Sequence, residues 1–420
     1  MSFELKTAVL NLELFIARRL LRGKREGAVS VPIVKIAVAG IALGICVMLL
    51  SVFIIGGFKQ EITEKLAGFT AHLDVTSYDN NDAYTGGSIV ATDTLLVILR
   101  GIRGVKQAAP YVTKPAILKS PSEIHGVILK GVDSLYDASF YGRHLQSGTL
   151  PRLDGRHASA EILLSASVAN LLGLRAGDKL TAHFVQDPPR TRLFTVQGIY
   201  DTGFREYDDL FVLCDIRQLQ RLNGWAPEEV SGIAVELRNL ETLPEAGAQL
   251  DELLPLDTHN RFLRISTLHD TAPQIFDWLS LLNMNVAVIL TLIIVVAGFN
   301  MVSGLLILIL DKTALIGILK ALGCRDASLK RLFLYLALGL ILRGMLLGNL
   351  LAFLLAAVQA LFHPIALNPA SYYMDTVPVR FDLWAALFLN IGVFAVSVLM
   401  LIIPTVLISK IRPIKAIRFE

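Results

Sequence analysis

The residue types that perform chemistry in enzymes occur in this chain, but their spacing does not build a catalytic site. Eight histidines are scattered, and none falls in a His-Glu-x-x-His zinc motif. Cys46, Cys214 and Cys324 lack metal-ligand spacing and are expected to be buried fillers. The nearest approach to a phosphate-binding loop, Gly173–Lys179 (GLRAGDK), has the wrong glycine-to-lysine spacing and predicts a turn. We therefore expect no catalytic residue, no metal ion and no cofactor in this chain.

The chemistry that the sequence does predict is docking to a partner protein, in the segment Asp311–Arg331 (DKTALIGILKALGCRDASLKR). Four aliphatic residues at helical spacing predict one apolar helix face: Leu315, Ile318, Leu319 and Leu322. Lys312 and Lys320 flank this face, and Gly323 stands where the helix is expected to end. A short amphipathic helix can insert into a groove of a partner, whereas a plain connector needs no apolar stripe. The pattern therefore favours docking over a simple connector.

One charged residue, Arg343, stands inside a long apolar run, Leu332–Phe362. A charge in the interior of a membrane is costly and often functional. Arg343 lies about twelve residues from the start of the run, roughly 18 Å along a helix. That depth is large for a side chain reaching back to the lipid headgroups. A pairing or cavity role and a headgroup contact both stay open.

The composition of the chain indicates a membrane protein. Hydrophobic residues make up 54% of the 420 residues and charged residues 18%, against about 25% in an average globular domain. Four apolar runs are each long enough to cross a bilayer core of about 30 Å as a helix: Ile36–Ile55, Leu281–Leu310, Leu332–Phe362 and Leu383–Ile408. The net charge of +3 gives no case for nucleic-acid binding.

The distribution of Lys and Arg predicts how the chain is oriented. Basic residues cluster before the first run, between the second and third, and after the fourth, whereas the segment between the third and fourth has only Arg380. Four spans with both termini in the cytoplasm satisfy this distribution. Phe3–Arg25 is predicted to be an amphipathic helix in the membrane interface, with an ordinary packing helix as the alternative.

The region between the first and second spans is predicted to be a large mixed α/β domain outside the cytoplasm. Six segments predict strands: His72–Tyr78, Gly126–Val132, Lys179–Val185, Arg192–Tyr200, Leu210–Leu213 and Ile233–Leu237. Three predict helices: Ser165–Leu172, Ile216–Leu222 and Leu243–Leu254. Pro188 and Pro189 separate two of the strands and predict a protruding hairpin tip. Phe58–Leu66 and Thr271–Asn285 are expected to join this domain to the spans as continuous helices.

Short segments along nearly the whole chain carry a family resemblance. In chain order they are Phe15–Arg19, Ile41–Gly44, Gly57–Phe58, Ile316–Gly323 (IGILKALG), Tyr373–Val379 (YMDTVPV) and Pro413–Glu420 (PIKAIRFE). Through them the chain resembles the permease subunits of lipoprotein-releasing ABC transporters, the LolC/LolE type within the MacB/FtsX superfamily. The most specific segment, Ile316–Gly323, is similar to the cytosolic coupling helix of that superfamily.

The resemblance implies a multi-pass protein of the bacterial inner membrane with a defined domain order. Residues 1–30 would form a cytoplasmic amphipathic helix and 31–56 the first transmembrane helix. Residues 57–275 would form a MacB-like periplasmic core domain. Residues 276–420 would form an FtsX-like region with spans two to four and the coupling helix, 311–331.

The resemblance also implies a set of partners. Two permease subunits, alike or different, would bind two copies of a separate ATPase, which holds ATP and magnesium. The ATPase would contact the coupling helix at Leu315, Ile316, Gly317, Ile318, Leu319, Lys320, Leu322 and Gly323. A lipoprotein would enter a cavity between the first two spans, its acyl chains against Leu50, Phe53 and Val286. A periplasmic carrier would contact the hairpin tip at Asp187, Pro188, Pro189 and Arg190.

Two features depart from the family pattern. Leu315 stands where the coupling helix usually carries Glu, and the hairpin tip, Gln186–Arg192, is short. Two other functions stay open within the superfamily. One is a MacB-type efflux permease, and the other is an FtsX-type signalling subunit that activates cell-wall hydrolases without transport.

Overall fold

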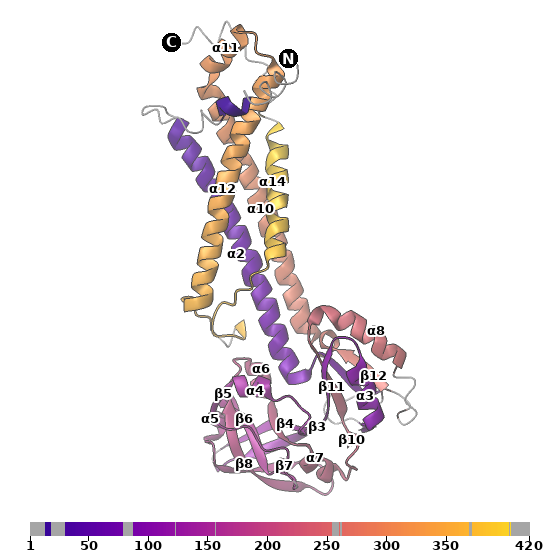
Figure 1. Cartoon of the computed structure of the whole chain (residues 1–420). Helices are drawn as coiled ribbons and strands as arrows, with labels where there is room; N and C mark the ends of the chain where they lie inside the picture. The colour runs from indigo at the N-terminus through magenta and orange to yellow at the C-terminus, as the bar shows by residue number, and fades with distance from the viewer. Residues whose placement is uncertain are drawn as a thin grey trace. The chain divides into compact units, whose positions relative to one another are not determined.

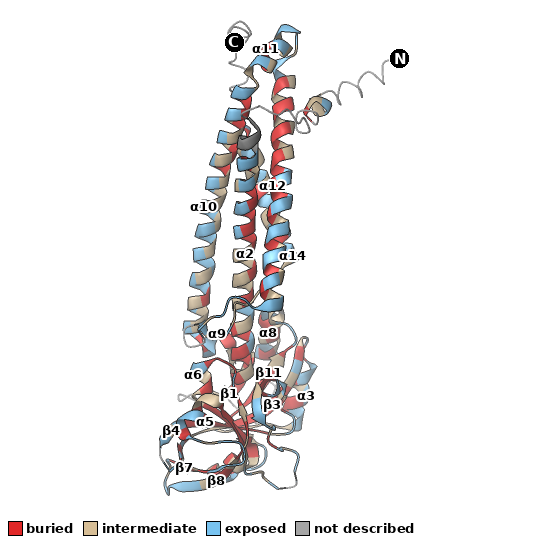
Figure 2. Ribbon diagram, turned by 90° about the vertical axis from the view of Figure 1, so that its left-hand side faces the viewer, coloured by how far each residue is buried: buried red, intermediate tan, exposed pale blue. Residues whose placement is uncertain are grey.

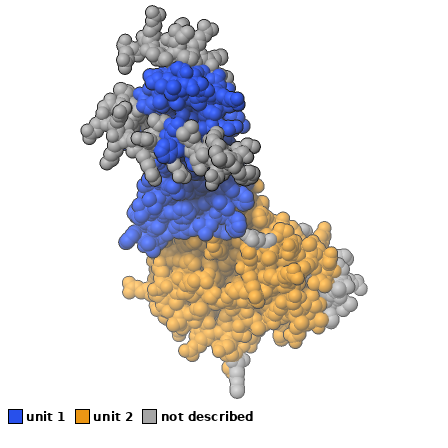
Figure 3. Space-filling model, turned by 45° about the horizontal axis from the view of Figure 1, so that its top comes forward, with its two compact units in different colours: residues 1–58, 279–365, 377–420 blue, residues 59–278, 366–376 orange. Residues whose placement is uncertain are grey.

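The computed structural model describes residues 13–17, 30–78, 87–121, 123–155, 157–253, 260, 263–368, 372–402 and 404. The chain divides into two compact units (Figure 3). Unit 1 comprises residues 1–58, 279–365 and 377–420, and unit 2 comprises residues 59–278 and 366–376. Most of the predicted N-terminal amphipathic helix and the C-terminal tail lie outside the described residues. Of the former, residues 13–17 are described and are helical.

Unit 1 is built from long apolar helices, as predicted (Figure 1). Its helices are α2 (Ser30–Thr70), α10 (Pro273–Asp311), α11 (Thr313–Ala321), α12 (Asp326–Phe362) and α14 (Leu383–Met400), of which α2 and α10 extend into unit 2. Within the described part of the chain, all of these except α11 are long and apolar enough to cross a membrane. The four predicted spans are thereby confirmed. The two predicted helical connections are confirmed too, because α2 and α10 continue unbroken beyond their apolar runs.

The helices of unit 1 differ in how much of their surface is covered. In the most apolar stretch of α2, 39% of the residues are buried, against 22% in that of α10. Figure 2 shows α10 mostly pale blue and tan, whereas α2 and α12 carry more red along their length. An apolar helix with so little protein around it meets lipid or another chain.

Unit 2 contains a large mixed sheet with helices on both faces. The strands are β1 (Leu73–Ser77), β2 (Ile89–Val90), β3 (Val105–Lys119), β4 (Ile124–Val132), β5 (Leu145–Gly148), β6 (Glu161–Ser165), β7 (Lys179–Phe184), β8 (Arg190–Tyr200), β9 (Phe211–Asp215), β10 (Glu229–Val230), β11 (Gly232–Leu237) and β12 (Leu263–Thr267). Their order is β12-β1-β11-β3-β4-β9-β6-β8-β5, with β7 paired to β3 and β8, while β2 and β10 pair separately. The β4–β9 and β6–β8 pairs are parallel and the others antiparallel. The predicted strands are confirmed; β2, β3, β5, β6, β10 and β12 are additional.

The helices of unit 2 are α3 (Asp93–Gly101), α4 (Ser139–Arg143), α5 (Ala166–Leu172), α6 (Arg205–Asp208), α7 (Ile216–Asn223), α8 (Leu243–Leu253) and α9 (Leu268–Thr271). The start of α5 is set by Ser165, whose side chain accepts a hydrogen bond from the Val168 amide. Its end is set by Gly173, in the left-handed conformation at φ 65°. The Arg175 amide then donates to the Asp178 carboxylate at 2.7 Å. The segment Gly173–Lys179 is therefore a helix end and a turn, as predicted.

Strand β3 is long although it contains Pro110 and Pro115. The Ser120 amide donates to Glu123, and the Ser231 amide donates to Tyr111. Even-numbered residues of β3 therefore direct their backbone groups toward β4, and odd-numbered residues toward β11 and β7. The nitrogen of Pro110 points past the last residue of β4, and that of Pro115 points between the ladders of β11 and β7. Neither proline removes a hydrogen bond from the sheet, which is why the strand tolerates both.

The last turn of α2 is anchored in an aromatic core on one face of the sheet. Phe69 is 1% exposed and is surrounded by rings from four other segments of unit 2: Phe140, Tyr141, Tyr200, Phe204, Tyr207 and Phe211, at centroid distances of 5.4 to 6.5 Å. Such ring pairs add stabilisation beyond the area that they bury. Phe69 therefore anchors the C-terminal end of α2 within unit 2.

Candidate functional site

Helix α11 forms one end of unit 1 and carries the predicted docking residues. Ile316 is fully buried and Gly317 is also buried, so this side of the helix packs on unit 1. Ile318 is 51% and Leu322 79% exposed, so the opposite side is apolar and open. Gly323, at φ 88°, follows the helix end as predicted, and Lys320 forms an ion pair with Asp326 at 2.9 Å.

The open stripe of α11 is narrower than the sequence predicted. Leu315 and Leu319 are half-buried, and Leu319 packs against the core of unit 1. The reason is that the helix is apolar on nearly all sides, and unit 1 uses part of that surface for its own packing. Ile318 and Leu322 are left for a partner. An exposed Leu322 has no stabilising role within the described part of unit 1, which makes it a docking candidate.

In the middle of unit 1, α12 packs closely against α2 through small residues four positions apart. A Cβ atom at Gly344 would lie 2.7 Å from the Ile41 side chain, and one at Gly348 would lie 2.6 Å from the Ala42 carbonyl oxygen. Ala352 and Ala356 continue the series and are fully buried. Small residues at this spacing let two helix backbones approach in lipid.

The predicted acyl-chain residues differ in how far they are buried. Phe53 is fully buried, with its ring 5.4 Å from Phe353 and 5.7 Å from Phe381. It therefore serves packing within unit 1. Leu50 and Val286 are half-buried, and Leu50 packs on the same core. A contact of Leu50 and Val286 with acyl chains stays a prediction.

Arg343 lies on an exposed side of α12 and lines a cavity of about 570 Å³. Lys35, Val38 and Ala39 of α2 line the same cavity, together with Leu346 and Leu347. Arg343 therefore faces a cavity that it shares with residues of α2, and its role there stays a prediction.

In unit 2, Lys65 binds a segment that comes from between the third and fourth spans. Lys65 is 6% exposed, and its Nζ donates to the carbonyl oxygens of Thr202 at 2.5 Å and Tyr373 at 3.1 Å. The ring of Tyr373 packs edge-on against Phe204 at 4.9 Å. Local sequence patterns gave no sign of this contact, because its parts are separated by more than a hundred residues.

Asp208 lies beside this contact in a buried hydrogen-bond network. It is 2% exposed and accepts hydrogen bonds from the hydroxyl and the amide of Thr202, at 2.9 and 3.2 Å. Burial raises the pKa of Asp208 to about 7, although the hydrogen bonds from Thr202 and the charge of Lys65 oppose the rise. Asp74 behaves similarly: burial raises its pKa to about 6 while Tyr111 donates to it at 2.6 Å.

The raised pKa of Asp208 predicts that unit 2 loses stability as pH rises from about 4 to about 7. In that window the unfolded chain has released the Asp208 proton and the folded protein keeps it, so the free energy of unfolding falls with pH. Asp208→Asn should keep the Thr202 contacts and lose the part of this dependence that Asp208 causes, gaining on the order of 2–4 kcal/mol relative to wild type between pH 4 and 8, while the part due to Asp74 stays. Thermal unfolding followed by Trp fluorescence measures it. Asp251→Asn, which changes an exposed residue of α8, is the control and should keep the pH profile of wild type. A pH profile of Asp208→Asn that runs parallel to that of wild type would contradict the prediction.

The predicted hairpin is present, formed by β7 and β8 with the loop 185–189. Val185 is 85% exposed, and Asp187, Pro188 and Pro189 are exposed too. Arg190 is not in the loop: it begins β8, opposite Phe184, and its guanidinium donates to the carbonyl oxygens of Arg221 and Leu222 at 3.3 Å. The guanidinium thereby holds the base of the hairpin against the end of α7.

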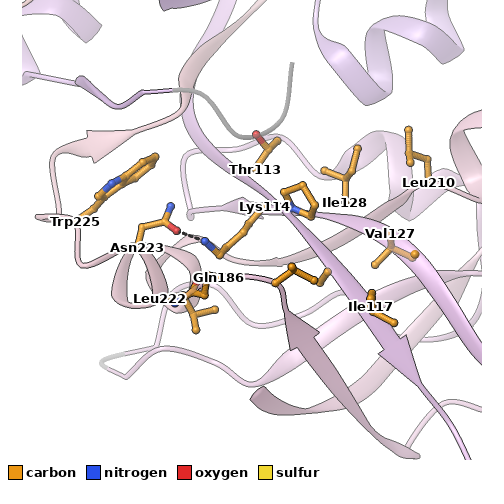
Figure 4. A pocket seen from close by; sticks show the side chains of 14 residues that line it. Thr113, Lys114, Ile117, Val127, Ile128, Gln186, Leu210, Leu222, Asn223 and Trp225 are labelled. Carbon is orange, nitrogen blue, oxygen red and sulfur yellow. Dashed lines mark hydrogen bonds between the residues drawn. The ribbon is translucent and has the colours of Figure 1, made fainter. Parts of the chain in front are cut away.

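A groove of about 790 Å³ lies at the base of the hairpin (Figure 4). Trp225, Leu222 and Val185 contribute apolar surface, and Lys114 Nζ donates to Asn223 Oδ1 at 2.6 Å across it. Its walls come from β3, β4, the end of α7 and the segments that follow β7 and α7 and precede β9, so no local sequence pattern could have indicated it. Elsewhere, no three metal-ligating side chains come together among the residues that the structure describes.

Two family profiles match the chain. Residues 36–253 match the MacB-like periplasmic core domain, and residues 287–413 match the FtsX-like permease C-terminal region. The residues between the two matched regions, 254–286, include the point in α10 at which unit 2 ends.

Several curated relatives match almost the whole chain. "Lipoprotein-releasing system transmembrane protein LolC" of Neisseria meningitidis serogroup B is 28% identical, covering 98% of this chain and 100% of the relative. The LolE protein of Haemophilus influenzae, with the same descriptive name, is 23% identical over 96% of this chain and 98% of its own. Among solved structures, the periplasmic region of MacB from Actinobacillus actinomycetemcomitans is 16% identical with a TM-score of 0.37, covering 50% of this chain and 95% of that one.

Proposed function

Because this chain belongs to the MacB-like periplasmic core domain family, we propose that it is the permease subunit of an ABC transporter that releases lipoproteins from a membrane. The observation that carries the proposal is similarity from end to end, over both units, to proteins named as transmembrane components of the lipoprotein-releasing system. The second family profile, of FtsX-like permeases, agrees with it.

In this proposal the ATPase is a separate chain, bound in two copies to two permease subunits. The open stripe of α11, Ile318 and Leu322, would enter a groove of the ATPase. ATP and magnesium would be held by that partner. Axial movement of α11 would reach unit 2 through α2 and α10, which are continuous from one unit into the other.

The cargo would be an acylated protein held by apolar contact alone. Each buried CH₂ contributes about 0.8 kcal/mol, so acyl chains need no hydrogen-bonding site. The open apolar surface of α10 supports this role, with Val288 and Leu292 each 64% exposed. A periplasmic carrier would take the cargo at the hairpin loop, where Val185 is exposed. The membrane would be the bacterial inner membrane, as the family resemblance implies, and the Lys and Arg distribution supports an orientation with both termini in the cytoplasm.

Site-specific photo-crosslinking tests the proposed function. A photoreactive residue at Leu292 or Val286 should capture triacylated lipoproteins without ATP and release them when the ATPase and ATP are added. The same residue at Phe53 is the matched control: Phe53 is fully buried by packing, so no cargo should be captured there. A photoreactive residue at Val185 should capture a soluble carrier. Capture of small amphiphilic drugs instead of lipoproteins would point to efflux, and binding of a wall hydrolase alone would point to signalling.

A further inference from the structure

The cavity beside Arg343 is lined by two cationic side chains and by apolar ones. It lies between α2 and α12 in unit 1, and the described residues that line it are Lys35, Val38, Ala39, Arg343, Leu346 and Leu347. Both charged residues among the six are cations. Lys35 and Arg343 are exposed, and no ion pair joins either of them to a described residue.

The packing of α12 on α2 fixes the depth of this cavity. Gly344, next to Arg343, approaches the Val38 carbonyl oxygen and the side chain of Ile41, so Arg343 lies about one turn inside the start of the apolar run at Ile36. Residues 343–362 then form a helix of about 30 Å, the thickness of a bilayer core. Arg343 therefore stands near the edge of the hydrocarbon layer, on the side where α11 lies.

This position corrects the depth of roughly 18 Å that the sequence suggested. Most residues before Arg343 in the apolar run are buried or half-buried, although Leu342 is exposed. Leu332, Phe333 and Leu336 are buried in the core of unit 1, together with Ala17 and Ile316. They are apolar because they pack on neighbouring segments.

Two adjacent cations at the edge of the hydrocarbon layer favour an anionic ligand. A phosphate is the matching group, because a guanidinium donates two parallel hydrogen bonds to it and an ammonium adds a point charge. Beyond Arg343, exposed leucines continue along α12 into the bilayer: Leu346, Leu347, Leu350, Leu351, Leu354 and Leu355. A ligand that fills this site thus carries a phosphate at one end and an aliphatic chain at the other.

We propose that Lys35 and Arg343 bind the phosphate of a glycerophospholipid from the leaflet on the α11 side, with one acyl chain along the exposed leucines of α12. The site is separate from the proposed cargo path, because a triacylated cysteine carries no phosphate. It stands whether the chain releases lipoproteins or performs another task.

Native mass spectrometry of the intact chain in detergent tests the proposal, with dioleoylphosphatidylglycerol as the probe. The wild-type chain should retain one bound lipid. At the same lipid concentration, the fraction of the Lys35→Gln, Arg343→Gln double variant with bound lipid should be at least tenfold lower. Arg343→Lys should keep most of the binding, because it keeps the charge. Dioleoylglycerol, with the same acyl chains and no phosphate, should bind at least tenfold more weakly. Glycerol 3-phosphate at millimolar concentration should not displace the lipid.

The matched control removes two positive charges from α12 at positions that do not line the cavity. Lys330→Gln with Arg331→Gln should retain lipid within twofold of wild type, and both double variants should show the helical circular dichroism of wild type. Equal retention by wild type and Lys35→Gln, Arg343→Gln would overturn the proposal. So would displacement by glycerol 3-phosphate, which would identify a soluble phosphate as the ligand. Loss of a chain–chain dimer with unchanged lipid retention would assign the cations to an interface and would likewise overturn it.

Discussion

Replacing Leu322 with Asp is expected to weaken ATPase binding by about 30-fold or more while the chain still folds and reaches the membrane. Leu322 is 79% exposed, so the substitution removes little packing from unit 1. In the complex it would place an unpaired carboxylate in an apolar groove, at a cost of about 2–5 kcal/mol. That cost corresponds to about 30-fold to several-thousand-fold weaker binding. The dissociation constant between the purified permease and its ATPase measures it.

The control for this prediction places the same side chain on the same end of unit 1 but outside α11. Ala327→Asp lies in the exposed first turn of α12, where a carboxylate is favourable. It should bind the ATPase within about threefold of wild type. Ile316→Asp should instead destabilise the chain itself, because Ile316 is fully buried. A dissociation constant for Leu322→Asp equal to that of wild type would remove α11 as the docking element.

Replacing Gly348 with Leu is expected to break the contact between α2 and α12. The new Cβ would meet the Ala42 carbonyl oxygen at 2.6 Å and the Ile45 Cβ at 2.9 Å. Backbone cannot rotate away as a side chain can, so the helices must separate. Overpacking of this kind costs about 1–3 kcal/mol or more, which exceeds the gain of about 1 kcal/mol in helix propensity. Thermal unfolding of the full-length chain in detergent should show a midpoint lowered by several degrees.

Gly392→Leu provides a matched substitution in the same unit. Gly392 lies in α14, and nothing stands within 4 Å of the position that its Cβ would occupy. This variant should be as stable as wild type or slightly more stable, since only the helix propensity changes. Equal unfolding midpoints for Gly348→Leu and Gly392→Leu would show that the close packing of α12 on α2 does not stabilise unit 1.

The elements that could be predicted from the sequence are those whose signal is local. Apolar runs of sufficient length predict α2, α10, α12 and α14, because a single segment in lipid can hydrogen-bond all of its backbone N–H and C=O groups only as a helix. The β7–β8 hairpin follows from paired prolines between two strand segments, and α5 from the helical pattern of Ser165–Leu172. The depth of Arg343 could not be found this way, since an apolar residue reads alike whether it faces lipid or protein.

The features that were missed depend on partners far along the chain. Strand β3 was not predicted because Pro110 and Pro115 disfavour a strand, and their harmlessness depends on where β4, β7 and β11 end. The width of the open stripe on α11 depends on how much of the helix unit 1 covers. Of the candidate site, the coupling segment and hairpin were therefore predicted, whereas the groove, the Lys65 contact and the cation cavity were not.

The pairing of β1 with β12 has a consequence for how such permeases could exchange parts. β1 follows α2, β12 precedes α9 and α10, and Leu73 pairs with Thr267, so the 59–278 segment enters and leaves its sheet on neighbouring strands. Neighbouring strands are about 4.8 Å apart, so the segment has the geometry of an insertion that can be grafted into another membrane scaffold at little cost in loop closure. Lys65 adds a condition, because one of its acceptors is the Tyr373 carbonyl oxygen on the separate 366–376 segment. A graft of 59–278 alone would leave the Lys65 ammonium with the Thr202 carbonyl oxygen but without that of Tyr373, whereas a graft of both segments would keep both acceptors, so we expect the two segments to be inherited together.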